Sequence, residues 1–152
     1  MVKSVIFLVI MKNDKPVVGV IGVGHLGQHH VKHYQLLEDA NLAGLYDVDS
    51  KRADIVAKQY KSTSFKNVSD LLAVCDAVSV VTPTETHIDV AEQAINNSCH
   101  VFIEKPITKT VEDADHLLKL AEKQNVLIQV GHIERLNPAL RALQAYNINP
   151  KF

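Results

Sequence analysis

The sequence predicts an α/β fold, a doubly wound parallel sheet in a single domain, and three observations predict it. From Pro16 onward, apolar segments alternate with segments of helical spacing. The apolar segments are continuous rather than alternating, which is typical of strands covered on both faces of a sheet. The first of them, residues 17–23, contains the start of a glycine-rich turn, as expected where a parallel strand is followed by a helix.

Each apolar or helical segment gives one expected element. Six strands are expected, at residues 17–23, 42–47, 62–65, 77–81, 100–103 and 126–130. The expected helices are 25–37, 50–59, a short one containing Leu71 and Leu72, 84–97, 111–124 and 137–145. Ser50 and Ser69 are the expected N-caps of the second and third helices, and Pro138 lies in the first turn of the last. Right-handed crossovers then give the strand order 3-2-1-4-5-6.

Length and composition limit the classes of protein. A chain of 152 residues makes about one domain, and its 47% hydrophobic content can fill a core. Sixteen basic side chains balance seventeen acidic ones without a basic stripe, which argues against a nucleic-acid partner. Cys75 and Cys99 are far apart and outside any CxxC motif, so we expect free thiols in a cytoplasmic protein.

The N-terminal segment is expected to lie outside the fold. Its apolar run, residues 5–11, is shorter than the roughly 20 residues that span a bilayer, and no small-residue cleavage site follows it. We therefore expect no membrane partner. The chain divides into an extension (1–15), the α/β domain (16–136) and a connecting segment (137–152).

The glycine-rich turn has the spacing of a diphosphate-binding loop. Gly22 permits the tight turn, Gly24 lets a diphosphate approach the backbone, and Gly27 allows helix and strand to pack closely. The first helical turn, with His25 and Leu26, would then present free N–H groups to the diphosphate. Together with a strand before it and a helix after it, the motif indicates a Rossmann dinucleotide-binding domain. The alternative is a glycine-rich turn without a ligand.

Asp47 closes the second apolar run at the distance where a ribose-binding acid is expected. A carboxylate there accepts hydrogen bonds from both ribose hydroxyls and repels a 2′-phosphate, which favours NAD over NADP. Lys51 and Arg52, one turn later, weaken this preference. The alternative for Asp47 is a helix-capping or loop acid.

Two further segments follow apolar runs at the same predicted edge of the sheet. Thr82 and Thr84 could meet a cofactor there, although Thr84 could equally be a simple N-cap. Lys105 ends the next run and could take part in proton transfer beside the nicotinamide or donate to a substrate hydroxyl. The alternative for Lys105 is a solvated lysine at a strand end.

Four histidines lie close together in the segment after the glycine loop. His25, His29 and His33 recur at helical spacing, with His30 beside them. No carboxylate or cysteine completes a coordination set with them, so we expect no metal.

Four sequence blocks together resemble one family. VIGVGHLGQHH, VVTPTETH, VFIEKPIT and VGHIERLNPAL, within residues 16–140, are similar in order and spacing to the Gfo/Idh/MocA family of NAD(P)-dependent oxidoreductases. The last block is most similar to the sugar-nucleotide branch, the UDP-N-acetylglucosamine and UDP-N-acetylglucosaminuronate 3-dehydrogenases. The resemblance implies hydride transfer between NAD and a hydroxyl-bearing carbon of a sugar or sugar nucleotide.

The resemblance also implies roles for individual residues. Lys105 would act next to the reacting carbon, and Glu104 would lie against the cofactor ribose. The residues lining the path to the nicotinamide would be Thr82, Pro83 and His87. The residues near the substrate would be His132, Glu134, Arg135 and Asn137, with Arg135 suited to an anionic group.

Family members have a second domain, which supplies a catalytic histidine, much of the sugar pocket and the contacts of a homo-oligomer. The chain ends at Phe152, about where that domain would begin. The resemblance therefore implies a cofactor-binding half that is inactive alone, with residues 137–152 starting the connection to a missing substrate domain.

Two other functions fit the same fold. A non-catalytic NAD(P)-binding sensor or regulatory module would keep the dinucleotide site but would have no need of Lys105. A methyltransferase-type nucleotide fold also places glycines after its first strand, but the Glu-Lys-Pro block and the length of the match argue against it.

Overall fold

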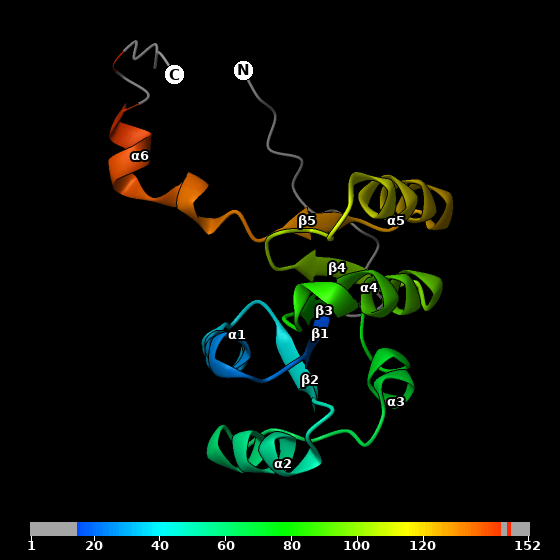
Figure 1. Ribbon diagram of the computed structural model, residues 1–152. Coiled ribbons are helices and arrows are strands. Elements are labelled where there is room, and N and C mark those ends of the chain that lie inside the picture. The colour runs from blue at the N-terminus through cyan, green and yellow to red at the C-terminus, as the bar shows by residue number, and fades with distance from the viewer. Residues whose placement is uncertain (1–14, 144–145, 147–152) are drawn as a thin grey trace.

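The structure is a computed structural model of the 152-residue chain and describes residues 15–143 and 146. Five parallel strands form one sheet in the order β2-β1-β3-β4-β5, with helices on both faces (Figure 1). The strands are β1 (Val17–Ile21), β2 (Asn41–Tyr46), β3 (Ala77–Val80), β4 (His100–Ile103) and β5 (Ile128–Val130). The helices are α1 (His25–Leu36), α2 (Ser50–Gln59), α3 (Val68–Leu72), α4 (His87–Asn96), α5 (Val111–Gln124) and α6 (Pro138–Leu143), with 3-10 turns η1 (Thr84–Thr86) and η2 (Ile133–Leu136).

Strand β1 supplies side chains to a core on each face of the sheet, because successive residues of a strand point in opposite directions. Val20 packs with Val31 of α1 and Val56 of α2. Ile21 belongs to the other core, which is shared with α3, α4 and α5. Since both faces are covered, β1 and β3 are buried along nearly their whole length, as their continuous apolar runs predicted.

The strand expected at residues 62–65 is wrong, and the sheet has five strands instead of six. This segment makes one isolated parallel bridge, between Leu45 and Ser64. Two backbone hydrogen bonds join it to β2, from Leu45 N to Thr63 O and from Phe65 N to Leu45 O. Three of its four residues are hydroxyl-bearing and only Phe65 packs on the core, so it has too little apolar surface to extend the pairing. The observed order is otherwise the expected one without its outer strand.

Two expected N-caps are also wrong. Asp49 rather than Ser50 caps α2, by accepting a hydrogen bond from Arg52 N. Asn67 rather than Ser69 caps α3, by accepting one from Asp70 N. At the start of each helix, two residues that can act as N-caps lie close together in the sequence. Each helix begins directly after the earlier of the two, so that residue is the N-cap.

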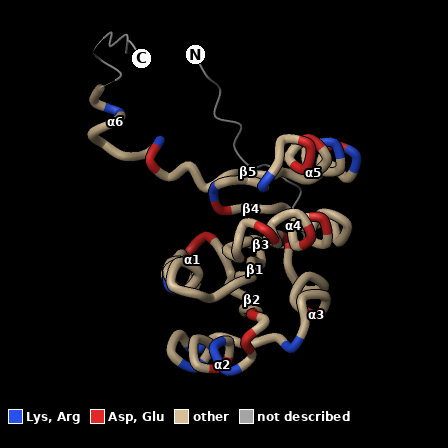
Figure 2. The backbone as a smooth tube through the Cα atoms, viewed as in Figure 1, with Lys and Arg blue, Asp and Glu red and all other residues tan. Residues whose placement is uncertain are grey.

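The helix expected over residues 84–97 is divided into η1 and α4. The last helix begins at Pro138, and its expected end at Ala145 lies outside the described residues, as does the apolar run 5–11. No helix among the described residues is both long and apolar enough to cross a membrane. Figure 2 shows Lys and Arg interspersed with Asp and Glu on α2 and α5.

The register brings the carboxyl ends of all five strands to one edge of the sheet. Ile21 lies beside both Tyr46 and Val80, and the pairing continues through Ile103 to Val130. The residues that directly follow these strand ends therefore share that edge: Gly22, Asp47, Val81, Glu104 and Gly131. In open parallel sheets this edge is where ligands bind.

Candidate functional site

The glycine loop joins β1 to α1 at this edge. Gly22 has φ +88°, a conformation that favours glycine, and a Cβ there would lie 2.7 Å from the carbonyl oxygen of Val81. A Cβ on Gly27 would lie only 1.9 Å from the carbonyl oxygen of Gly22. These two glycines thus allow the turn and the close packing of α1 on the strand end.

Gly24 differs from the other two glycines because it borders open space. A Cβ built on it would meet no atom within 4 Å. Gly24 is also the N-cap of α1, makes no side-chain capping hydrogen bond, and is followed by no acidic residue in the first turn. Helices α2, α3 and α5 have side-chain caps, whereas α4, which directly follows η1, has none. The start of α1 therefore has backbone N–H groups free for an anionic ligand.

Asp47 follows β2 and lies beside the glycine loop. Its carboxylate accepts a hydrogen bond from Val23 N at 2.8 Å and another from Asp49 N at 2.9 Å. Arg52 donates two more, from Nε at 3.1 Å and from Nη2 at 2.7 Å. Burial alone would raise the pKa of Asp47, but the hydrogen bonds from Arg52, Asp49 and Val23 outweigh burial, and the pKa is lowered. The side chain is therefore a carboxylate at neutral pH.

Thr82 follows β3 on the other side of the glycine loop. Its Oγ1 is buried and has no hydrogen-bond partner among the described residues. A buried hydroxyl without a partner is uncommon and is suited to a ligand. Pro83 directly precedes η1, and Thr84 is the first residue of that turn. The caps of η1 and α4 are Pro83 and Thr86, so Thr84 does not have the alternative role of an N-cap.

His87 is almost completely buried, with 1% of its surface exposed. Its Nδ1 lies 2.9 Å from the carbonyl oxygen of Pro106, and its Nε2 lies 2.9 Å from that of Thr82. The ring thus ties the segment after β3 to the segment after β4. Its contacts make His87 a positioning residue for both segments rather than a residue facing the cofactor.

Glu104 follows β4 and is buried beside α1. Its Oε1 lies 3.1 Å from His30 Nε2, and its Oε2 accepts a weak hydrogen bond from Lys105 N at 3.3 Å. A Cβ on Gly131 would come within 3.1 Å of this carboxylate, so Gly131 leaves room for it. Burial lowers the pKa of His30, and the neighbouring Glu104 only partly opposes this. The contact of His30 with Glu104 is not apparent from the spacing of these residues in the sequence.

Lys105 is exposed next to Glu104. Within the described part of the chain its ammonium group takes part in no ion pair. This ammonium group lies at the edge that carries the glycine loop and is available to donate to a substrate hydroxyl.

The expected substrate residues lie in η2 and at the start of α6, which projects away from the sheet beyond β5 (Figure 1). Asn137 donates to Glu134 at 2.9 Å and accepts from Ala139 N at 3.0 Å. Among the described residues, no side-chain hydrogen bond or ion pair links His132, Arg135 or Asn137 to the glycine loop, Asp47 or Glu104. His132 directly follows Gly131, which lies against Glu104, whereas Arg135 and Asn137 are further along the segment that leads away from β5.

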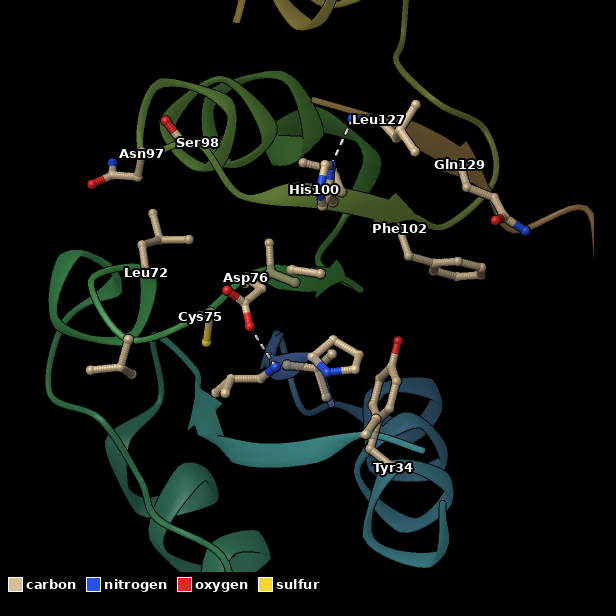
Figure 3. A pocket seen from close by; sticks show the side chains of 18 of the residues that line it. Tyr34, Leu72, Cys75, Asp76, Asn97, Ser98, His100, Phe102, Leu127 and Gln129 are labelled. Carbon is tan, nitrogen blue, oxygen red and sulfur yellow. Dashed lines mark hydrogen bonds between the residues drawn. The ribbon is translucent and has the colours of Figure 1, made fainter. Parts of the chain in front are cut away.

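A cavity of about 660 Å³ lies at the opposite edge of the sheet, where the strands begin (Figure 3). Asp76 there accepts a hydrogen bond from Val17 N, and His100 Nδ1 accepts one from Leu127 N. Burial, with a smaller effect of nearby Cys99 and Asp76, raises the pKa of the Cys75 thiol to about 12. Asp76 and His100 thus have hydrogen-bond partners, and the raised pKa makes the Cys75 thiol a weak nucleophile. A smaller cavity of about 420 Å³ borders Asp47.

No group of three or more His, Cys, Asp or Glu side chains within residues 15–143 and 146 is arranged to hold a metal ion. The rings of His25 and His29 meet edge to face, with centroids 5.3 Å apart. His30 instead contacts Glu104 and Phe102.

The site combines a glycine loop that leads into a helix without a side-chain cap, a buried carboxylate and the Glu-Lys-Pro segment. Comparison with known proteins also indicates a dinucleotide-binding domain. Residues 17–132 match the model of the oxidoreductase family with an NAD-binding Rossmann fold, GFO_IDH_MocA. This chain belongs to the Gfo/Idh/MocA family. The family, the fold and NAD as cofactor, all predicted from the sequence, are confirmed. Relatives that include a UDP-N-acetylglucosamine 3-dehydrogenase and a glucose-6-phosphate 3-dehydrogenase are oxidoreductases rather than regulatory modules.

Among the Gfo/Idh/MocA relatives, UDP-N-acetylglucosamine 3-dehydrogenase of Acidithiobacillus ferrooxidans is 44% identical over 126 residues, covering 83% of this chain and 40% of that protein. Its crystal structure superimposes with a TM-score of 0.83 at 42% identity, over 88% of this chain and 43% of that one. A scyllo-inositol dehydrogenase from Lactobacillus casei, solved with NAD(H) and scyllo-inositol, gives a TM-score of 0.79 at 27% identity, over 86% and 40% of the two chains. The chain thus spans about two fifths of the length of these relatives.

Proposed function

We propose that this chain is the cofactor-binding part of an NAD-dependent dehydrogenase that transfers a hydride between the nicotinamide cofactor and a hydroxyl-bearing carbon of a sugar or sugar nucleotide. The observation that carries the proposal is the common edge shared by the open Gly24, the ionised Asp47 and the exposed Lys105. Diphosphate, ribose and reacting hydroxyl each need one of these groups.

The residues present fit a dinucleotide. Gly24 leaves the space that a diphosphate needs, while Gly22 and Gly27 hold the loop in shape. The first turn of α1, with His25 and Leu26, offers N–H groups to the diphosphate. Asp47 would accept hydrogen bonds from the adenosine ribose, and Thr82 Oγ1 is a buried hydroxyl in need of a partner.

The other proposed contacts position the nicotinamide half. Pro83 and Thr84 would line its path, and Glu104 would contact its ribose. His87 acts through the carbonyl groups of Thr82 and Pro106, which it holds in place. When bound, NAD accepts the hydride, and Lys105 would take or give the proton of the substrate hydroxyl, because an amine at this edge can reach the group being oxidised.

The substrate class follows from the similarity to a UDP-N-acetylglucosamine 3-dehydrogenase. In our proposal, residues 16–136 form the cofactor domain and residues 137–152 begin a connection to a substrate domain. His132, Arg135 and Asn137 would face the substrate only once such a domain organises η2 and α6. By itself the 152-residue chain would therefore bind NAD(H) without turning over a sugar nucleotide.

Isothermal titration calorimetry of the chain with NADH tests the proposal. We expect saturable binding with one site per chain, and loss of that binding in Asp47→Ala. Leu118→Ala, at an exposed position on α5, is the control and should bind as the unmodified chain does. Absence of NADH binding in the unmodified chain, or steady-state turnover of a sugar nucleotide by it, would contradict the proposal.

A further inference from the structure

Arg52 covers the carboxylate on which the proposed ribose site depends. We infer that Arg52 is a specificity-determining latch: it must leave Asp47 for NAD to bind, and it remains on Asp47 to receive the 2′-phosphate of NADP. This inference rests on the proposed dinucleotide site and goes beyond it, because it makes one cation oppose NAD and favour NADP.

The first step is a count of hydrogen bonds on Asp47. An ionised carboxylate offers about four lone-pair positions. Oδ2 accepts from Val23 N and Arg52 Nε, while Oδ1 accepts from Asp49 N and Arg52 Nη2, at distances of 2.7 to 3.1 Å. All four positions are thus taken. Two ribose hydroxyls can be accepted only if two of these donors leave.

The second step identifies the donors that leave. Val23 N is backbone of the glycine loop and Asp49 N is backbone of the turn into α2, so neither can move without opening the site itself. Arg52 holds its two bonds through one flexible side chain, which is 42% exposed, whereas the Asp47 side chain is only 5% exposed. The Arg52 end of this ion pair is thus open to solvent, although its carboxylate end is buried. Arg52 is therefore the partner that a ribose diol displaces.

The third step concerns a 2′-phosphate. A guanidinium has five N–H groups, and Asp47 uses two of them, leaving Nη1 and one N–H of Nη2. Nη1 lies 3.8 Å from an Asp49 carboxylate oxygen at the outer side of the latch. With Arg52 in place, the buried negative charge of Asp47 is compensated and the remaining N–H groups match a phosphate. The closed latch thus accepts a 2′-phosphate, and the open latch accepts a diol.

The latch predicts opposite effects on the two cofactors when Arg52 is neutralised. In Arg52→Gln we expect the Kd for NADH to fall about threefold to fivefold, because the half-exposed Arg52 side chain no longer has to leave Asp47. The Kd for NADPH should rise about tenfold or more, since hydrogen bonds to a charged group are lost. A change in net charge alone would shift both cofactors in the same direction.

Calorimetric titration of the 152-residue chain with NADH and NADPH at one fixed salt concentration is the test. Lys51→Gln is the matched control, because it removes the same charge from the adjacent exposed position of α2 and leaves the contacts of Asp47 unchanged. Tighter NADH binding in Arg52→Gln than in Lys51→Gln, with weaker NADPH binding, supports the latch. NADH binding that is equal or weaker in Arg52→Gln overturns it.

A second variant keeps the test decisive if Arg52→Gln does not fold. Arg52→Lys retains the charge but cannot form both bonds to Asp47 in the side-on geometry. It should bind NADH more tightly than the unmodified chain does and retain part of the NADPH binding; unchanged NADH binding in a folded Arg52→Lys chain overturns the latch. If the unmodified chain binds neither nucleotide, the proposed function fails, a result distinct from failure of the latch.

Discussion

Glu104 and His30 meet 3.1 Å apart, across the space between the end of β4 and helix α1. This contact joins the segment that carries Lys105 to the helix that begins at the glycine loop. Both side chains are largely buried, at 9% and 16% exposed. The two halves of the proposed cofactor site are therefore held together by a polar contact between residues 74 positions apart in the chain.

The lowered pKa of His30 predicts a loss of stability in acid. The unfolded chain, in which this pKa has its ordinary value of 6.5, takes up the proton more readily than the folded chain does. Stability therefore falls as the pH drops below about 6.5. In His30→Gln, which can still donate to Glu104, urea unfolding at pH 7 and pH 5 should show a smaller loss of stability.

The matched control for His30→Gln is His116→Gln, because His116 is exposed and contacts Glu92 at the surface. This control should lose as much stability between pH 7 and pH 5 as the unmodified chain does. Burial also lowers the pKa of His100, so part of the pH dependence should persist in His30→Gln. Equal pH dependence in His30→Gln and His116→Gln would contradict the prediction.

Alanine substitutions should separate the glycine that shapes the loop from the glycine that leaves space for a ligand. Gly27→Ala places a Cβ against the carbonyl oxygen of Gly22 and should cost about 2 to 3 kcal/mol of unfolding free energy. Gly24→Ala meets no atom and should cost no more than about 1 kcal/mol as a poorer N-cap. Urea unfolding measures both.

Binding should follow a different order from stability. Gly24→Ala should remain folded but bind NADH at least about tenfold more weakly, because its Cβ occupies the space needed by the diphosphate. A titration that shows unchanged affinity in this variant would mean that the diphosphate does not bind over Gly24.

Replacing His87 should weaken both the fold and the site. His87→Leu leaves the carbonyl groups of Thr82 and Pro106 without their buried partner, at a cost of about 2 kcal/mol. The two segments would be held less firmly, so NADH affinity should fall as well. Thermal unfolding and calorimetry measure the two effects, with His116→Leu as the surface control. Normal NADH affinity in a folded His87→Leu chain would show that the contact serves stability alone.

The two thiols should react slowly in the folded chain. Burial above all raises the pKa of Cys75 to about 12 and that of Cys99 to about 11. At pH 8 no more than about one thiol in a thousand is then ionised, and the thiolate is the reactive form. A chromogenic disulfide reagent should label the native chain slowly and the urea-unfolded chain quickly. Fast labelling of the native chain would contradict the prediction.

Local pattern was sufficient for much of the fold. The helix expected over residues 111–124 and the strand over 100–103 have the observed bounds, because each has an uninterrupted periodicity with clear ends. The prediction of an outer strand at residues 62–65 was wrong because this hydroxyl-rich segment forms only the bridge at Ser64. The predicted N-caps of α2 and α3 were wrong because two nearby residues at each helix start can both act as N-caps. Which of the two does so depends on the residue at which the helix begins in the folded chain.

The sequence by itself determined the family, the parallel sheet and the common edge of Gly24, Asp47 and Lys105, because parallel strands necessarily end together. Only the tertiary structure decided which side chains meet there. The pairing of His30 with Glu104, the burial of His87 and the placement of Arg52 on Asp47 depend on how each helix or turn is oriented against the sheet. Residue spacing along the chain does not fix that orientation, which comes from packing of the two cores.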